Sequence, residues 1–265
     1  MRKVRSGKVA AAFAVLLVVS FAVMNAMPSD TLPAALLQEA VLALVAFAAV
    51  GFAIPDAHKR CTKSVQQWSI VRFATIALLL VGLVGDAITL LAWLFAGGGT
   101  MACFVSTALP STADLMENLL LLLGICLLTG LYEESFMRVL GIEAFERALD
   151  TKRAILASAA LFALLHVGAP DVSAGQLVLL QAALKFGQAL LFGVILGALY
   201  VRTRRLWPCA FIHAGFDVLY MAPNVLLTGT MPETYASGAV GDTVLLAVSV
   251  LMLSGIVLKI RNEIA

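Results

Sequence analysis

The chain has 265 residues, of which 62% are hydrophobic and only 13% are charged. Soluble domains carry charges on about 25% of their residues, so this composition excludes an ordinary soluble protein. The formal net charge of +2 is too small, and the basic residues are too scattered, for a nucleic-acid-binding protein. The sequence therefore predicts an all-α polytopic membrane protein that has the lipid bilayer as a partner and binds no nucleic acid.

The first apolar run follows a basic N-terminus. Residues 1–8 contain four Arg or Lys residues, and residues 9–26 are apolar. This run is longer than the apolar core of a signal peptide, which has about 7 to 15 residues, and it ends without a clear small-residue cleavage site. We therefore expect an uncleaved first transmembrane helix.

Seven further apolar runs have, or nearly have, the length of about 20 residues that a helix needs to cross a bilayer. Each is predicted to be a helix, because the backbone must close its own hydrogen bonds inside a membrane. The runs are 34–54, 70–96, 115–137, 154–167, 176–200, 207–226 and 243–258. The run 154–167 is short, so we expect its helix to begin at an N-cap near Asp150 or Thr151. The sequence thus predicts about eight transmembrane helices.

Basic residues occur in every second connection between these runs. Lys and Arg cluster before the first run and after the second, fourth, sixth and eighth, whereas the other connections contain neither. By the positive-inside tendency, this alternation places both termini in the cytoplasm. We accordingly expect a multi-pass protein of the cell (plasma) membrane.

Two adjacent carboxylates and an arginine stand at the end of the run 115–137. Charges at membrane depth cost at least about 2.5 kcal/mol each, so they persist mainly where they pair, face a cavity or do chemistry. Glu134 and Arg138 are four residues apart, in the favourable order for an ion pair, which leaves Glu133 as the spare carboxylate. Such a carboxylate can serve as a general base. A charged collar where the helix leaves the membrane explains the cluster equally well.

Two of the three histidines lie in apolar runs. His166 follows Phe162 by four residues, and the simplest interpretation of such a histidine is a packing residue. His213 precedes Asp217 by four residues, so one helix face can offer an imidazole and a carboxylate to the same metal, water or substrate oxygen. A histidine that bonds only to its own aspartate is the alternative.

Together the three patterns are much more specific than any one of them. Glu-Glu-x-x-x-Arg, Phe-x-x-x-His and His-x-x-x-Asp occur in this order on successive predicted helices. They resemble the CPBP intramembrane proteases, the family of CAAX prenyl endopeptidases and bacteriocin-processing or immunity proteins. The similarity extends over about residues 115–226 and includes a Gly-x-x-x-Gly helix (Gly193, Gly197) that is followed by Leu-Trp-Pro. Many members carry Asn where this chain has Asp217.

The resemblance implies an intramembrane endopeptidase that hydrolyses a peptide bond of a membrane-associated protein or peptide. If the roles known in this family apply to the matching residues here, Glu133 and His166 would activate the attacking water. His213 and Asp217 would hold or polarise the oxyanion side of the scissile bond. Peptide hydrolysis needs an activated water, a proton donor for the leaving amine and a stabiliser for the oxyanion, and convergent polar groups can supply all three.

The resemblance gives Glu134 and Arg138 a bracing role and leaves the catalytic type open. Two imidazoles and two carboxylates could also hold Zn²⁺ with a catalytic water. The metal ligands would then be Glu133, His166, His213 and Asp217. The resemblance accordingly implies either a glutamic-type protease without a cofactor or a metalloprotease with Zn²⁺.

Helix lengths set a condition on this site. At a rise of about 1.5 Å per residue, Glu133 lies one or two turns from the cytoplasmic end of a helix that ends at Met137, whereas His166 lies about 18 Å from Ala154. The two residues meet only if the helix of His166 begins below the membrane surface or the helix of Glu133 sinks deeper, and we predict the former. The site is expected in the cytoplasmic half of the membrane.

A second polar stripe lies in the run 176–200. Gln181, Lys185 and Gln188 follow one another at spacings of four and three residues, and Asp86 in the run 70–96 is the expected partner of Lys185. A structural buried pair is the simpler interpretation, and a chamber wall along the substrate path is the alternative.

We expect one membrane domain with three parts. Residues 1–114 form helices one to three, residues 115–226 form the catalytic core, and residues 227–265 contain the last helix. Two other function classes remain open, namely a non-catalytic immunity or binding protein on the same scaffold and a proton-coupled transporter. Transporters commonly contain inverted repeats, and no internal repeat stands out here.

Overall fold

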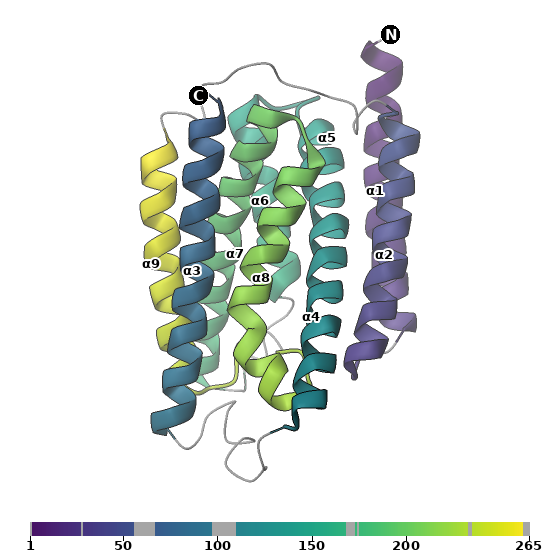
Figure 1. Cartoon of the computed structure of the whole chain (residues 1–265). Coiled ribbons are helices and arrows are strands. Elements are labelled where there is room, and N and C mark those ends of the chain that lie inside the picture. Colours follow the sequence, from purple (N-terminus) through teal and green to yellow (C-terminus); the bar gives the residue numbers. More distant parts are fainter. Residues whose placement is uncertain are drawn as a thin grey trace.

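The computed structural model describes residues 2–27, 29–55, 67–96, 110–167, 173, 175–232 and 235–261, and these ranges contain helices and no strand. The elements are α1 (Arg2–Ala26), α2 (Leu32–Ala53), α3 (Gln67–Ala96), α4 (Thr112–Glu133), the π-helix η3 (Glu134–Ile142), α5 (Glu143–Phe145), α6 (Thr151–Val167), α7 (Gln176–Thr203), α8 (Leu206–Thr228) and α9 (Val240–Ile260). Figure 1 shows the long helices side by side, with the start of α1 and the end of α9 at the same end of the bundle. The predicted all-α polytopic fold is confirmed.

Seven spans in the described residues are long and apolar enough to cross a membrane, and one of them runs without a break through α4, η3 and α5. The remaining long helix, α6, has 17 residues and falls just short of the usual length. It begins at Thr151, as predicted, with the N–H of Arg153 donating to Oδ1 of Asp150 at 2.9 Å. The eight predicted helices are therefore present, and seven of them qualify as spans by length and composition.

The helix that carries the two adjacent acids is longer than predicted. It does not end at Met137 but continues as η3 to Ile142 and as α5 to Phe145. The sequence pattern ends the transmembrane helix just before Arg138, but the side chain of Arg138 is 0% exposed. All nine residues of η3 are buried. Segments of π-helix are rare and occur frequently at functional sites.

Two closely packed helix pairs, α4 with α8 and α6 with α7, hold the polar motifs. A Cβ atom at Gly130 of α4 would lie 2.6 Å from the carbonyl oxygen of Ala210 on α8. A Cβ atom at Gly193 of α7 would lie 2.9 Å from Cβ of Ala159 on α6. Because only glycine lacks this atom, these positions let the backbones approach closely. The registers of α4 on α8 and of α6 on α7 are thereby fixed.

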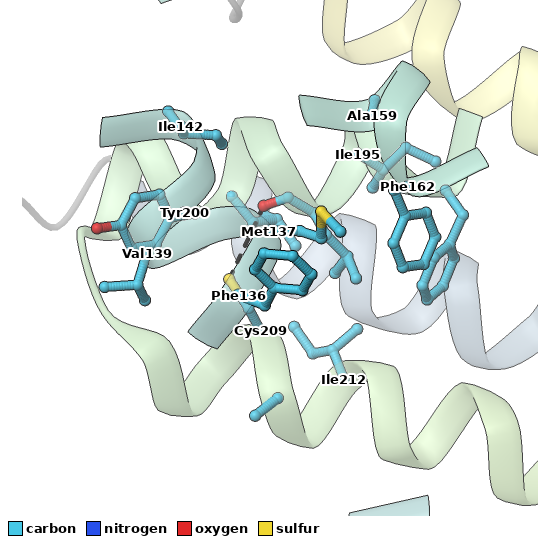
Figure 2. Close-up of a cluster of buried hydrophobic side chains, with 14 of the residues drawn as sticks. Phe136, Met137, Val139, Ile142, Ala159, Phe162, Ile195, Tyr200, Cys209 and Ile212 are labelled. Carbon is cyan, nitrogen blue, oxygen red and sulfur yellow. Dashed lines mark hydrogen bonds between the residues drawn. The ribbon is translucent and has the colours of Figure 1, made fainter. Parts of the chain in front are cut away.

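An apolar core surrounds η3, and Figure 2 shows Phe136 and Met137 among side chains from the neighbouring helices. The hydroxyl of Ser158 on α6 donates to the carbonyl oxygen of Met137 at 2.6 Å, so α6 also satisfies a backbone group of the π-helix. Between helices in a membrane, such packing stabilises through van der Waals contact rather than through removal of apolar surface from water.

Some predictions fall outside the described residues. The basic connection at 58–63 and the outer connections at 97–109 and 168–172 are among these positions. The cytoplasmic placement of both termini, which depends on the charges of the connections, stays a prediction.

Candidate active site

The structure brings all six predicted site residues into one cluster. These residues come from α4, η3, α6 and α8, and the first and the last of them are 84 positions apart along the chain. The cluster consists of Glu133, Glu134, Arg138, His166, His213 and Asp217.

His213 is the centre of this cluster. Its Nδ1 lies 2.8 Å from Oε1 of Glu134. Its Nε2 lies 3.4 Å from Oε2 of Glu133 and 3.3 Å from Oδ2 of Asp217. The residue is only 3% exposed, and the ring of Phe192 packs edge-on against it at 4.9 Å. The contact with Glu134 fixes the orientation of the imidazole, so Nε2 points at the other two carboxylates.

His166 approaches Glu133 from the other side. Its Nε2 lies 3.8 Å from Oε1 of Glu133, which is longer than a direct hydrogen bond. Its Nδ1 lies 2.9 Å from the carbonyl oxygen of Phe162, one turn earlier on α6. A carbonyl can only accept, so Nδ1 carries the proton and a neutral ring leaves Nε2 free to accept. Glu133 thus lies between two imidazoles.

The meeting of Glu133 and His166 depends on the length of the helix that carries the acids. Glu133 lies twelve residues before the end of its span at Phe145 rather than close to the end of the helix. The helix of Glu133 therefore continues further than predicted, whereas the start of the helix of His166 below the membrane surface stays a prediction.

Arg138 lies behind Glu134 and reaches toward α6. Its Nε is 3.2 Å from Oε2 of Glu134, in the ion pair that their spacing predicts. Its guanidinium carbon lies 4.6 Å from the centre of the Phe162 ring. A desolvated cation–π contact is worth about 2 kcal/mol. Arg138 therefore links η3, through Phe162, to the helix that carries His166.

Glu39 of α2 is a further acid near the cluster, and the sequence patterns do not reveal it. It accepts a hydrogen bond from Thr129 and interacts electrostatically with Asp217 and His213. Its Oε2 is buried and has no hydrogen-bond partner among the described residues. The sequence feature that indicates a role for Glu39 is an acid inside an apolar run, as at Glu133.

Lys185 of α7 also lies toward the cluster rather than toward Asp86. Its charge interacts with Asp217 and Glu133. Its Nζ donates to Oε1 of Gln188 at 3.2 Å. In the described part of the chain, Asp86 and Lys185 form no ion pair, and the expected structural pair is therefore not formed.

A cavity of about 250 Å³ adjoins Glu133 and His166. It lies between α1, the junction of α4 with η3, and α6, and most of its wall is apolar. Its lining includes Leu17, Phe21 and Met24 of α1. The two residues that are expected to activate water are therefore adjacent to a space that suits an apolar group.

The geometry gives no support to the zinc alternative. Among the residues that the structure describes, no group of three or more His, Cys, Asp or Glu side chains is placed to hold a metal ion. The chemistry proposed below uses only side chains of the protein.

Comparison with known proteins agrees with this geometry. Residues 115–219 match the family model described as Rce1-like, type II CAAX prenyl endopeptidase. No curated protein matches the chain. The matched residues include every member of the cluster around His213. Through this segment the chain is similar to the Rce1-like type II CAAX prenyl endopeptidases, and its predicted resemblance to the CPBP family of intramembrane proteases is confirmed.

Proposed function

We propose that this protein is an intramembrane endopeptidase that hydrolyses a peptide bond of a membrane-associated protein or peptide by means of a water activated by Glu133 and His166. The observation that carries the proposal is the position of Glu133 between two imidazoles, at 3.4 Å from His213 and 3.8 Å from His166. The family match supports a CAAX-type intramembrane protease at the level of the family.

The first step is attack of water on the scissile carbonyl carbon. A water between Glu133 and His166 donates one hydrogen to each, because the carboxylate oxygen and Nε2 of His166 are both acceptors. Glu133 takes a proton from this water as the new carbon–oxygen bond forms. The carbonyl oxygen gains negative charge, and His213 stabilises it as an imidazolium that donates from Nδ1 to Glu134 and from Nε2 to the oxyanion.

The second step is collapse of the tetrahedral intermediate. The carbon–nitrogen bond breaks, and Glu133 returns its proton to the leaving amine, so the products are a carboxylic acid and an amine. Asp217, at 3.3 Å from Nε2 of His213, holds the imidazole at the oxyanion side. Its carboxylate can donate to the oxyanion only when it is protonated.

Glu134 and Arg138 support this chemistry without touching the substrate. Glu134 contacts Nδ1 of His213 at 2.8 Å, so it fixes the ring that faces the oxyanion. Arg138 pairs with the outer oxygen of Glu134 at 3.2 Å and offsets its charge. Groups that orient an acid or a base in this way are typical of hydrolytic sites.

We further propose that the site lies in the cytoplasmic half of the membrane. His213 follows the start of α8 at Leu206 by seven residues, or about 10 Å. The turn before Leu206 contains Arg204 and Arg205, and positively charged connections favour the cytoplasmic side.

A cleavage assay in proteoliposomes tests the proposal. The substrate is a fluorogenic peptide that is anchored in the bilayer by a farnesylated cysteine near its C-terminus. Glu133→Gln and His166→Ala should each lower kcat about 10²- to 10⁴-fold, because each removes a group that handles the proton of the water. Glu117→Gln is the matched control, since Glu117 is an exposed acid on the same helix. Full activity of both site variants would refute the mechanism.

A further inference from the structure

A pair of charged side chains joins the end of the acid-bearing span to the turn between α7 and α8. The guanidinium of Arg204 binds both carboxylate oxygens of Glu146, with Nη1 donating to Oε2 at 3.0 Å and Nη2 donating to Oε1 at 2.8 Å. Two parallel bonds of this kind fix the direction of the contact as well as its distance. The Glu146–Arg204 pair is therefore a directional link between segments that are 58 positions apart along the chain.

Both members of this pair are mostly surrounded by protein. The side chains of Arg204 and Glu146 are 28% and 21% exposed. Oε1 of Glu146 also accepts a hydrogen bond from the hydroxyl of Thr151, at the start of α6, at 3.0 Å. The guanidinium lies over the ring of Tyr200, at 5.6 Å from its centre. Exposed ion pairs hold little, whereas a bidentate pair in such surroundings keeps one geometry.

A second contact runs beside the first. The hydroxyl of Tyr200, one turn before Arg204, donates to Oε1 of Glu143 at 2.9 Å. Nη1 of Arg204 lies 4.0 Å from the same oxygen. Glu143 is the first residue of α5 and directly follows η3. Two residues at the end of α7 thus hold the two acids that come after the π-helix.

The backbone of Arg204 is strained. This residue caps α7, and its φ of +50° lies in the left-handed region, where many helices end in a glycine. Glycine adopts this conformation without steric cost, whereas an arginine keeps it only where the surrounding structure imposes it. The bidentate contact with Glu146 is what a glycine at this position would lose.

The π-helix lies between this pair and the catalytic cluster. At its first residue, Glu134 contacts Nδ1 of His213 at 2.8 Å. Four residues after its last residue, Glu146 contacts Arg204, which precedes the start of α8 by two residues. Both contacts join the acid-bearing span to the turn before α8 or to the first half of α8. The π-helix is therefore tied to the same neighbouring segment before and after its nine residues.

Such ties explain why this segment stays π-helical. A π-helix is rare, so its surroundings must hold it against rewinding as an α-helix. Rewinding would lengthen the segment and turn its two ends relative to each other, because an α-helix has fewer residues per turn. The hydroxyl of Ser158 holds the carbonyl of Met137 near the first end. At the other end, the Glu146–Arg204 pair opposes both movements.

We propose that Glu146 and Arg204 are positioning residues, which act on the reaction through the π-helix by keeping Glu134 in contact with His213. Both residues lie outside the seven membrane spans and outside the catalytic cluster. Without the pair, Glu134 loosens and the imidazole is free to turn away from the oxyanion. The variants should therefore bind substrate normally and turn it over more slowly. This kinetic consequence rests on the proposed function, whereas the effect on the His213 ring does not.

Two variants remove the pair in different ways. Arg204→Gly removes the bidentate contact and also relieves the backbone strain, so the melting temperature should stay close to that of wild type. Glu146→Gln keeps the size of the side chain but loses its charge. Arg204→Lys keeps the charge without the two parallel donors and should have an intermediate effect. Arg153→Gln is the matched control, because it breaks only the exposed ion pair of Arg153 with Asp150 at the start of α6.

The ring resonances of histidine report the position of Glu134 without turnover. The chain has three histidines, so variants that lack His58 or His166 assign the spectrum of full-length ¹⁵N-histidine-labelled protein in nanodiscs. In wild type we expect the Nδ1–H proton of His213 at low field, because it is bonded to a carboxylate. In Arg204→Gly and Glu146→Gln this proton should move upfield, since a longer hydrogen bond is weaker. In both variants kcat should fall about tenfold with KM unchanged.

An unmoved His213 resonance in both variants would overturn the proposal, and so would an equal shift in Arg153→Gln. If Arg204→Gly and Glu146→Gln unfold, or melt earlier while the resonance stays in place, the pair only stabilises the fold and the proposal is likewise overturned. Failure of the proposed function has a different signature. Wild-type protein would then leave the peptide uncut, while the resonance would still move in the two variants.

Discussion

Oε1 of Glu134 lies 2.8 Å from Nδ1 of His213, and this contact joins the π-helix to α8 at the centre of the site. It orients the imidazole from behind, so that the opposite nitrogen faces Glu133 and Asp217. The two neighbouring glutamates therefore have different positions around one ring, with Glu134 at Nδ1 and Glu133 at Nε2.

Glu134 should tolerate replacement better by Gln than by Ala. Gln keeps an oxygen that can accept from Nδ1 of His213 but loses the ion pair with Arg138, so kcat should fall about tenfold. Ala leaves the imidazole without its orienting partner and should lower kcat about 10²- to 10³-fold, with KM nearly unchanged in both variants. Steady-state kinetics on the farnesylated peptide provides the measurement. Equal losses in the two variants would show that Glu134 does not act by orienting His213.

Phe162 should be important for stability as well as for activity. Its ring lies 4.6 Å from the guanidinium of Arg138 and 4.1 Å from the ring of His166. Phe162→Leu keeps an apolar side chain but removes both ring contacts, and the loss should be about 2 kcal/mol. The apparent melting temperature in detergent should fall and kcat should decrease.

Phe211→Leu is the comparison for this variant. Phe211 is a phenylalanine of α8 whose side chain is 58% exposed, so its replacement should change neither quantity appreciably. An equal drop in melting temperature for both variants would contradict the role given to the Phe162 ring.

The close approach of α4 and α8 predicts a severe effect for a single methyl group. A Cβ atom at Gly130 would lie 2.6 Å from the carbonyl oxygen of Ala210, and a backbone atom cannot move aside as a flexible side chain does. Overpacking of this kind costs about 1 to 3 kcal/mol. Gly130→Ala should therefore lower the apparent melting temperature and the cleavage rate together.

Gly255 of α9 offers the control, because a Cβ atom there meets nothing within 4 Å. Gly255→Ala should be neutral or slightly stabilising, since alanine has the higher helix propensity. Unchanged stability of Gly130→Ala would mean that the two helices are not packed as closely as the structure indicates.

Removal of metal ions should leave activity intact. In the described part of the chain, no group of three or more His, Cys, Asp or Glu side chains is placed to hold a metal ion. Cleavage measured before and after incubation with 1,10-phenanthroline should agree, and purified protein should contain far less than one zinc ion per chain. Loss of activity that Zn²⁺ restores would assign the cluster to a metalloprotease.

The spacing of the motifs predicted which side chains meet, whereas hydropathy misplaced the end of their helix. Residues four apart on a helix share a face, so Glu134 with Arg138 and His213 with Asp217 could be paired without a structure. A hydropathy scale counts the charge of Arg138 as unfavourable in a membrane and therefore ends the helix before it. The scale does not include the ion pair with Glu134 or the contact with the Phe162 ring, which offset this free-energy cost inside the protein.

The partner of Lys185 could not be predicted for a related reason. Helix α7 is apolar on most of its circumference, and a pattern of this kind does not show which face meets which neighbour. Depth in the membrane alone suggests Asp86 as the ion-pair partner of Lys185. The packing of α7 on α6 and α9 instead directs Lys185 at Gln188 and Tyr235.

The π-helix from Glu134 to Ile142 makes the number of residues in this segment part of the site. Its hydrogen bonds reach back five residues, whereas those of α4 reach back four, so it holds more residues per turn than an α-helix. A shortened chain, for example one that lacks Ser135, would return toward α-helical winding and rotate Arg138 relative to Glu133. A deletion here would therefore act on the chemistry at a distance, by changing the direction of side chains that are themselves left intact.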